Sequence, residues 1–308
     1  MKIVFMGTPR AAVPSLERLA ADGHEVVAVY TQPDRPAGRG QKLTTSPVKD
    51  AALGFGIPVV QPEKIRTAEA LSEFESFNAE SAVVVAYGRI LPEAFLHAFP
   101  RGCINVHFSL LPKYRGAAPV NWAIVNGENV TGVTTMQMDA GLDTGDILLQ
   151  QETSIAPGET AIELMDRLAI LGADALATTL NGLDAIIPTK QDDSQASLAP
   201  ILKKEDGRFD WSDAAVVIER RVRGFQPFPT TYTSFHNKKL TLWKTEIADL
   251  QIDSVVPGTV LQAKADDLVI ACGEGALRIL EIQTEGRRRM STRDFLNGAK
   301  LDEGDLFE

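Results

Sequence analysis

Short apolar runs alternate with amphipathic segments along the first part of the chain. Residues 2–6 predict a strand that is apolar at every position after Lys2, and Val13, Leu16 and Leu19 then recur at a spacing that places them on one face of a helix. The repeated pattern predicts strands over residues 25–31, 57–60, 81–86 and 103–108, and helices over residues 48–55, 68–77, 90–99 and 120–125. Apolar strands separated by helices indicate a mostly parallel sheet that is covered on both faces.

The alternation then changes. Residues 132–138 and 146–155 predict an antiparallel pair of strands, and residues 160–180 predict a long amphipathic helix. We therefore predict that residues 1–189 form an α/β domain of the Rossmann type, with a doubly wound sheet.

The last third of the chain has a different pattern. Residues 187–200 are polar and show no period, which is typical of a linker, and we place this linker at residues 190–206. Beyond it, the pattern predicts a helix over residues 213–223 and strands over residues 230–235, 240–247, 258–263, 268–271 and 276–283. Short strands at this spacing favour a small OB-like β-barrel over residues 207–308.

Composition and charge narrow the possible functions. The 308 residues are 44% hydrophobic and 23% charged, as expected of a globular protein with two domains. The net charge of −10 excludes a protein that holds nucleic acid by bulk positive charge, so any contact with RNA must be local. No run approaches the roughly 18 apolar residues of a membrane helix, and the N-terminus does not have the pattern of a signal peptide. We expect a cytoplasmic protein that does not bind membranes.

The two cysteines do not indicate a metal site or a disulfide. Cys103 and Cys272 lie far apart in the sequence and lack the close spacing of metal ligands. We expect buried, reduced thiols at both positions and no bound metal.

Candidate chemistry lies at the end of the fifth predicted strand. Ligands of doubly wound sheets bind beyond the carboxyl ends of the strands, and Asn105 and His107 occupy such a position. Two residues apart on a strand, they point to the same face. A histidine there can be a hydrogen-bonded structural residue. Together with a carboxamide it can instead bind an oxyanion and transfer a proton.

The acidic loop over residues 138–146 has three alternative interpretations. It can be a solvated turn, or it can bind a divalent cation, although its acids lack the spacing of an EF-hand. In the third, a carboxylate from this loop meets His107 and completes an acid-base group.

A dinucleotide cofactor is not expected. The turn at residues 7–9 lacks the GxGxxG pattern, and the second predicted strand does not end at an acidic residue that could bind a ribose.

One long motif carries a resemblance to a known family. Residues 105–119 (NVHFSLLPKYRGAAP), together with residues 138–146, resemble the folate-dependent formyltransferases. The segments at residues 5–9, 31–40, 84–88 and 224–229 extend the resemblance over almost the whole chain, and they are similar to the members whose acceptor is methionyl initiator tRNA. Phe108 departs from the pattern, because a glycine is often found there in the family.

The resemblance implies a function and a set of site residues. It implies transfer of a formyl group from 10-formyltetrahydrofolate to the amino group of methionyl initiator tRNA, through a tetrahedral intermediate. Asn105, His107 and Asp143 would be catalytic, and the folate would bind at Ser109, Leu110, Leu111 and Pro112. We expect the chain to act as a monomer.

Clustered basic residues are the candidate tRNA contacts. Residues 34–42 alone are typical of a mobile surface loop, but the resemblance makes them a loop that enters the acceptor end of the tRNA, with contacts from Arg35, Arg39 and Lys42. In the C-terminal domain each basic cluster alone is typical of a solvated face, but together they suit a phosphate backbone. These clusters contain Arg220, Arg221, Arg223, Lys238, Lys239, Arg287, Arg288 and Arg289, with Arg293 nearby.

Two other functions remain open at this stage. A sugar-nucleotide N-formyltransferase would use the same folate and the same catalytic residues, but it would have little use for the basic loop. A non-catalytic RNA-binding protein would explain the β-barrel and the basic clusters, but not Asn105, His107 and the segment at residues 109–112.

Overall fold

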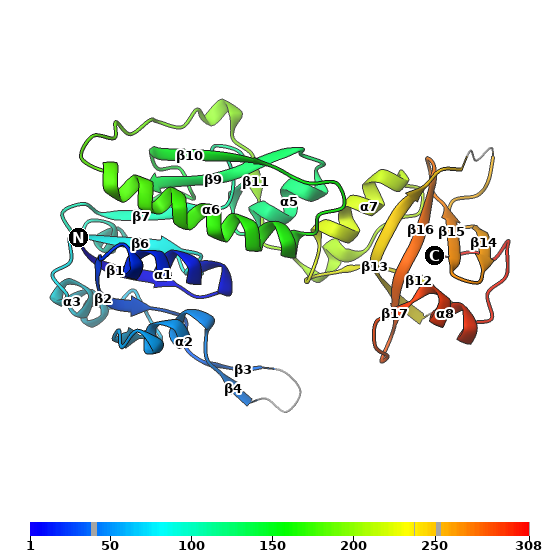
Figure 1. Ribbon diagram of the computed structural model, residues 1–308, viewed down its shortest axis with the longest axis horizontal. Helices are drawn as coiled ribbons and strands as arrows, with labels where there is room; N and C mark the ends of the chain where they lie inside the picture. The colour runs from blue at the N-terminus through cyan, green and yellow to red at the C-terminus, as the bar shows by residue number, and fades with distance from the viewer. Residues whose placement is uncertain (38–41, 237, 251–253, 308) are drawn as a thin grey trace. The chain divides into compact units, whose positions relative to one another are not determined.

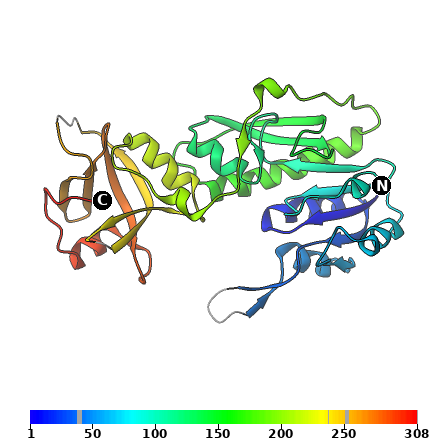
Figure 2. The same ribbon diagram turned by 180° about the vertical axis from the view of Figure 1, so that it is seen from behind.

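The described residues, 1–37, 42–236, 238–250 and 254–307 of a computed structural model, form two compact units (Figures 1 and 2). The first unit contains Met1–Pro119, Val130–Ser154 and Met165–Ala199. The second contains Val120–Asn129, Ile155–Leu164 and the described part of Pro200–Glu308.

A seven-stranded sheet forms the centre of the first unit, in the order β10-β9-β7-β6-β1-β2-β5. Its strands are β1 (Lys2–Gly7), β2 (Glu25–Tyr30), β5 (Val59–Val60), β6 (Ser81–Val85), β7 (Cys103–His107), β9 (Val130–Gln137) and β10 (Ile147–Ser154). The pairs β1–β2, β1–β6, β2–β5 and β6–β7 are parallel, whereas β7–β9 and β9–β10 are antiparallel. The predicted α/β fold and its antiparallel pair are therefore confirmed.

The helices cover both faces of this sheet. They are α1 (Val13–Ala21), α2 (Pro47–Gly54), α3 (Ala68–Ser76), α4 (Glu93–Leu96) and α6 (Ala161–Gly182), with a short 3-10 helix η1 at Arg10–Ala12. Helix α5 (Pro119–Val125) lies almost entirely in the second unit. On one face Phe74 of α3 and Phe95 of α4 pack with Met6 and Tyr30. On the other, α1 and α6 are joined by an ion pair between Arg18 and Asp174.

One predicted helix was too long. The apolar pattern indicated a helix over residues 90–99, but α4 contains only Glu93–Leu96. Pro92 precedes it with φ −63° and ψ 151°, which is an extended conformation, and a proline also disfavours helical geometry in the residue before it. The apolar pattern over residues 90–99 arises because side chains of this segment fill the core, although the segment does not form a long helix.

The second unit is a small β domain, as predicted. An antiparallel sheet has the order β12-β13-β16-β15-β14, and β17 pairs with β16. The strands are β12 (Thr231–Phe235), β13 (Lys238–Ala248), β14 (Val260–Lys264), β15 (Asp267–Ala271), β16 (Ala276–Thr284) and β17 (Met290–Ser291), and the helices are α7 (Ala215–Gly224) and α8 (Thr292–Gly298). Its core includes Trp211, Ile218, Leu242, Ile270 and Phe295. The sequence did not predict α8 or β17, because seven and two residues are too few to show a clear helical or strand pattern.

The segment interpreted as a linker contains local structure. Two 3-10 helices, η2 (Asp193–Gln195) and η3 (Lys204–Gly207), flank the short strand β11 (Leu198–Ala199). Strand β11 pairs in parallel with β8 (Arg115–Gly116). The first part of the segment is thus hydrogen-bonded to the motif that follows β7.

Both cysteines are buried and free, as predicted. Burial raises the pKa of each thiol to about 12. In the described ranges, no helix is long and apolar enough to cross a membrane.

Gly132 allows β9 and β10 to approach closely. A Cβ atom there would lie 2.2 Å from the carbonyl oxygen of Gln151 and 2.6 Å from Cδ2 of Leu110. Because a backbone atom cannot move aside as a side chain can, Gly132→Ala should lower the free energy of unfolding by about 1–3 kcal/mol or more. Urea titration would measure this. The matched control is Gly54→Ala, which places its Cβ in open space at the end of α2 and should have little effect. Equal stability of the two variants would contradict the packing argument.

Candidate active site

Strand β7 places Asn105 and His107 on one face of the sheet. Asn105 lies opposite Val84 of β6 and Met136 of β9, and His107 lies opposite Thr134. Both side chains are largely buried, with 8% and 6% of their surface exposed. In the described part of the chain, no hydrogen bond engages the Asn105 carboxamide, so both of its hydrogens are available to a bound group.

The imidazole of His107 lies between a carbonyl and a carboxylate. Its Nε2 lies 2.9 Å from the carbonyl oxygen of Tyr114, and its Nδ1 lies 3.7 Å from Oδ2 of Asp143. Because a carbonyl only accepts, Nε2 carries a hydrogen and donates it to Tyr114. This bond fixes the plane of the ring and leaves the Nδ1 edge facing Asp143.

Asp143 is held in the loop between β9 and β10. The backbone N–H of Gly116 donates to its Oδ2 at 2.8 Å, and its φ of +52° lies in the left-handed region. Within the same loop, the carboxylate of Asp139 accepts from Gly141 N–H and from the Thr144 hydroxyl. In this loop, Asp143 therefore lies beside His107, whereas Asp139 stabilises the turn.

Residues outside the predicted site also contact this loop. The side-chain amide of Gln191 donates to the carbonyl oxygens of Asp143 and Gly145, both at 2.8 Å. Nε of Arg115 donates to Oε1 of Gln191 at 2.9 Å. Arg115 stood inside the motif that carried the resemblance, but no pattern singled out Gln191, because it lies in a polar segment without a period.

Phe108 points away from Asn105 and His107. A Cβ atom on Gly172 of α6 would lie 3.0 Å from Cγ1 of Val106 and 3.3 Å from the Phe108 ring, so both side chains face α6. The bulk of Phe108 therefore fills the helix side of the sheet, and the missing side chain of Gly172 makes room for it.

The predicted folate segment is only partly accessible. Ser109 and Leu111 are buried, whereas Leu110 and Pro112 are partly exposed. The Ser109 hydroxyl donates to the carbonyl oxygen of Lys113 at 2.7 Å, and the N–H of Leu111 donates to the Thr134 hydroxyl. Of the four residues, Leu110 and Pro112 are thus partly accessible, and Ser109 stabilises the loop.

The two ends of the basic loop at residues 34–42 form a short hairpin. Strand β3 (Arg35–Ala37) pairs with β4 (Lys42–Thr44), and Arg35 is exposed. Arg39 lies outside the described residues, and only the backbone of Lys42 is described. At the base, Asp34 accepts hydrogen bonds from Lys49 at 2.5 Å and from Gln61 at 2.8 Å, and these bonds lower the pKa of its carboxyl group. The hairpin therefore has a fixed base.

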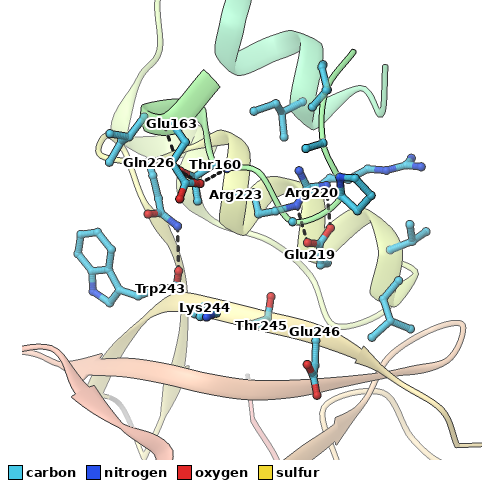
Figure 3. Close-up of a pocket in the computed structure, with 18 of the residues that line it drawn as sticks. Thr160, Glu163, Glu219, Arg220, Arg223, Gln226, Trp243, Lys244, Thr245 and Glu246 are labelled. Carbon is cyan, nitrogen blue, oxygen red and sulfur yellow. Dashed lines mark hydrogen bonds and ion pairs between the residues drawn. The ribbon is translucent and has the colours of Figure 1, made fainter. Parts of the chain in front are cut away.

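Part of the predicted basic set in the second unit surrounds a cavity of about 860 Å³ (Figure 3). Arg220, Arg223 and Arg289 line it. Arg223 is paired with Glu219, and Arg289 is paired with Glu281 and lies 5.2 Å from the Trp243 ring centre. The cavity therefore contains both signs of charge.

The other predicted basic residues occupy different positions. Lys238 and Arg287 line a second cavity of about 650 Å³, and Lys239 lies over the Tyr232 ring. Arg288 is exposed. Arg221 donates to the carbonyl oxygens of Asp206 and Arg208. The structure thus divides the predicted set into two groups that line cavities and a few separate residues.

No group of three or more His, Cys, Asp or Glu side chains in the described ranges is arranged to hold a metal ion. The acids nearest His107 are instead engaged with backbone N–H groups and hydroxyls, as described above.

Comparisons with known proteins identify the family of the chain. The model of the Formyl transferase family matches residues 1–180, and that of the Formyl transferase C-terminal domain matches residues 201–300. A methionyl-tRNA formyltransferase of Solibacter usitatus is 53% identical, over 99% of this chain and 98% of its own. One of Caldanaerobacter subterraneus subsp. tengcongensis is 51% identical over all of both chains.

A solved structure has the same fold. The N-formyltransferase of Helicobacter canadensis, in complex with folinic acid and dTDP-3-aminofucose, superposes with a TM-score of 0.69 at 20% identity, covering 91% of this chain and 98% of its own. Two family models together match most of the chain, and its relatives are about half identical to it over its whole length. The chain therefore belongs to the formyltransferase family, among the methionyl-tRNA formyltransferases.

Proposed function

We propose that the chain transfers the formyl group of 10-formyltetrahydrofolate to the α-amino group of methionyl initiator tRNA. The observation that carries this proposal is the group formed by Asn105, His107 and Asp143. It lies in a chain whose relatives, about half identical to it over their whole length, are methionyl-tRNA formyltransferases.

Asn105 stabilises the oxyanion of the reaction. Attack of the amine nitrogen on the formyl carbon forms a C–N bond and places negative charge on the formyl oxygen. The Asn105 amide can donate to that oxygen, because no hydrogen bond within the described residues engages it. Its nearly buried position limits competition from water.

His107 and Asp143 transfer protons. When the intermediate collapses, the bond between the formyl carbon and folate N10 breaks, and N10 must gain a proton while the amine loses one. Nε2 of His107 is engaged by Tyr114, so the proton passes at the Nδ1 edge beside Asp143. At 3.7 Å, Nδ1 and Oδ2 of Asp143 are beyond the distance of a direct hydrogen bond, and contacts of this kind in catalytic sites often tighten only when substrate is bound.

Only part of the basic set supports a tRNA site. Arg35, Arg39 and Lys42 are proposed to contact the acceptor end from the β3–β4 hairpin, whose base is fixed by Asp34. Exposed cations of the second unit, including Arg287 and Arg288, are proposed to follow phosphates. The chain is proposed to act as a monomer in the cytoplasm.

One comparison distinguishes this proposal from its alternatives. Formyl transfer would be measured with charged initiator tRNA, charged elongator tRNA and a nucleotide-linked amino sugar as acceptors. Preference for the initiator tRNA is expected. Transfer to the amino sugar alone would identify a sugar-nucleotide N-formyltransferase, and RNA binding without folate binding would identify a non-catalytic RNA-binding protein.

Asp143→Asn should lower the turnover number about 100-fold or more, because it keeps the shape of the side chain and removes its charge beside His107. Circular dichroism would confirm the fold. The matched control is Asp139→Asn, in a loop carboxylate that contacts Gly141 and Thr144, and it should retain most activity. Near-normal turnover of Asp143→Asn would remove this residue from the mechanism.

Asn105→Ala should lower the turnover number by about 100- to 1000-fold, as the loss of an oxyanion donor does in other enzymes. Equilibrium binding of a reduced folate should change little, because the interaction belongs to the transition state. Loss of folate binding with full turnover at saturation would show that Asn105 binds folate rather than the oxyanion.

Arg39→Ala should reduce transfer to tRNA and weaken discrimination between initiator and elongator tRNAs, with folate affinity unchanged. Neutralising Arg287, Arg288 and Arg289 should instead weaken binding of both tRNAs equally. It should also flatten the salt dependence of binding by about one unit of slope for each lost phosphate contact. Unchanged rates and discrimination in Arg39→Ala would make the loop a passive surface segment.

A further inference from the structure

Asp143 has a conformation that requires support. Its φ of +52° lies in the left-handed region, which is unfavourable for most residues with a side chain. Such conformations persist only where surrounding contacts determine them. The Gly116 N–H holds one carboxylate oxygen, but it does not fix the backbone on either side of Cα.

Gln191 supplies the contacts that fix this backbone. Its Nε2 donates one hydrogen to the carbonyl oxygen of Asp143 and the other to that of Gly145, each at 2.8 Å. Gly145 has no room for a side chain, because a Cβ there would lie 1.8 Å from the carbonyl oxygen of Gln137. The two bonds therefore hold the peptide units after Asp143 in one arrangement.

Arg115 fixes Gln191 in turn. Its Nε donates to Oε1 of Gln191, so the amide cannot turn over without losing all three bonds. The side chain of Arg115 is 8% exposed and also pairs with Asp193. Its backbone leads directly to Gly116, whose N–H holds the Asp143 carboxylate. The neighbours Arg115 and Gly116 thus fix two parts of Asp143: Arg115 fixes its backbone through Gln191, and Gly116 fixes its carboxylate.

We propose that Gln191, oriented by Arg115, is a positioning residue that holds Asp143 so that its carboxylate faces Nδ1 of His107. This inference rests on the proposed function, because it assigns Gln191 a role through Asp143. Without the two amide bonds, Asp143 relaxes toward an ordinary φ and its carboxylate turns away from the ring. Gln191 does not touch the reacting atoms.

The test is Gln191→Glu. The variant keeps the shape and the acceptor for Arg115, but it replaces the two donors with an oxygen that repels the carbonyl oxygens of Asp143 and Gly145. The turnover number at saturating substrates should fall about 10- to 100-fold, with little change in KM for folate or tRNA, as expected of a displaced catalytic group. The matched control is Gln195→Glu, whose exposed amide contacts Asp192 and should leave turnover unchanged.

A double-mutant cycle separates positioning from general stability. In the Asp143→Asn background, Gln191→Glu should cost almost nothing further, because both changes remove the same contribution. Gln191→Ala tests the same point without the added charge, and thermal unfolding of each variant monitors folding.

Three results would contradict the inference. Turnover of Gln191→Glu within about twofold of the parent would overturn it, and so would an equal loss in the Asp143→Asn background. Either result would leave the proposed function intact. Normal turnover of Asp143→Asn alone would overturn both the inference and the mechanism proposed for Asp143.

Discussion

The alternation of side chains along β7 is the constraint on which the candidate active site depends. Successive residues of a strand point to opposite faces, so Val106 and the following Phe108 pack against α6 while Asn105 and His107 face the other way. A shift of one residue in pairing would exchange the two sets. Pairing with β6 on one side and β9 on the other fixes this register, and hence places Asn105 and His107 on the same face.

The change from parallel to antiparallel pairing at β7 determines where Asp143 arrives. Because β9 runs against β7, its last residue, Gln137, lies opposite Ile104 near the start of β7. The loop that follows must return along the strand for Asp143 to reach His107 at its end. Gly145 and the left-handed conformation of Asp143 allow this return. The proximity of Asp143 to His107 therefore results from the sheet topology and from one residue in the left-handed region.

The sequence predicted the first unit well, because its elements have regular periods. The strand at residues 103–108 and the pair at residues 132–138 and 146–155 could be predicted from apolar patterns, and Asn105 and His107 from their spacing on one strand. The meeting of Asp143 with His107 was one of several alternatives for the acidic loop, because it depends on a loop conformation that has no periodic pattern. Gln191 could not be found, since its bonds come from a segment distant in sequence. The basic set was identified by residue type, which does not reveal that Arg223 and Arg289 are already paired with acids.

The short strand β11 has a consequence for dividing the chain into fragments. It pairs with β8 through Leu198 and Ala199, and Gln191 lies a few residues before it. A fragment that ends at residue 189, where the pattern of the sequence changes, lacks both and leaves the loop of Asp143 without its outer support. A fragment that ends at residue 199 keeps them. The edge of the first unit thus lies within a stretch of sequence that has no periodic pattern.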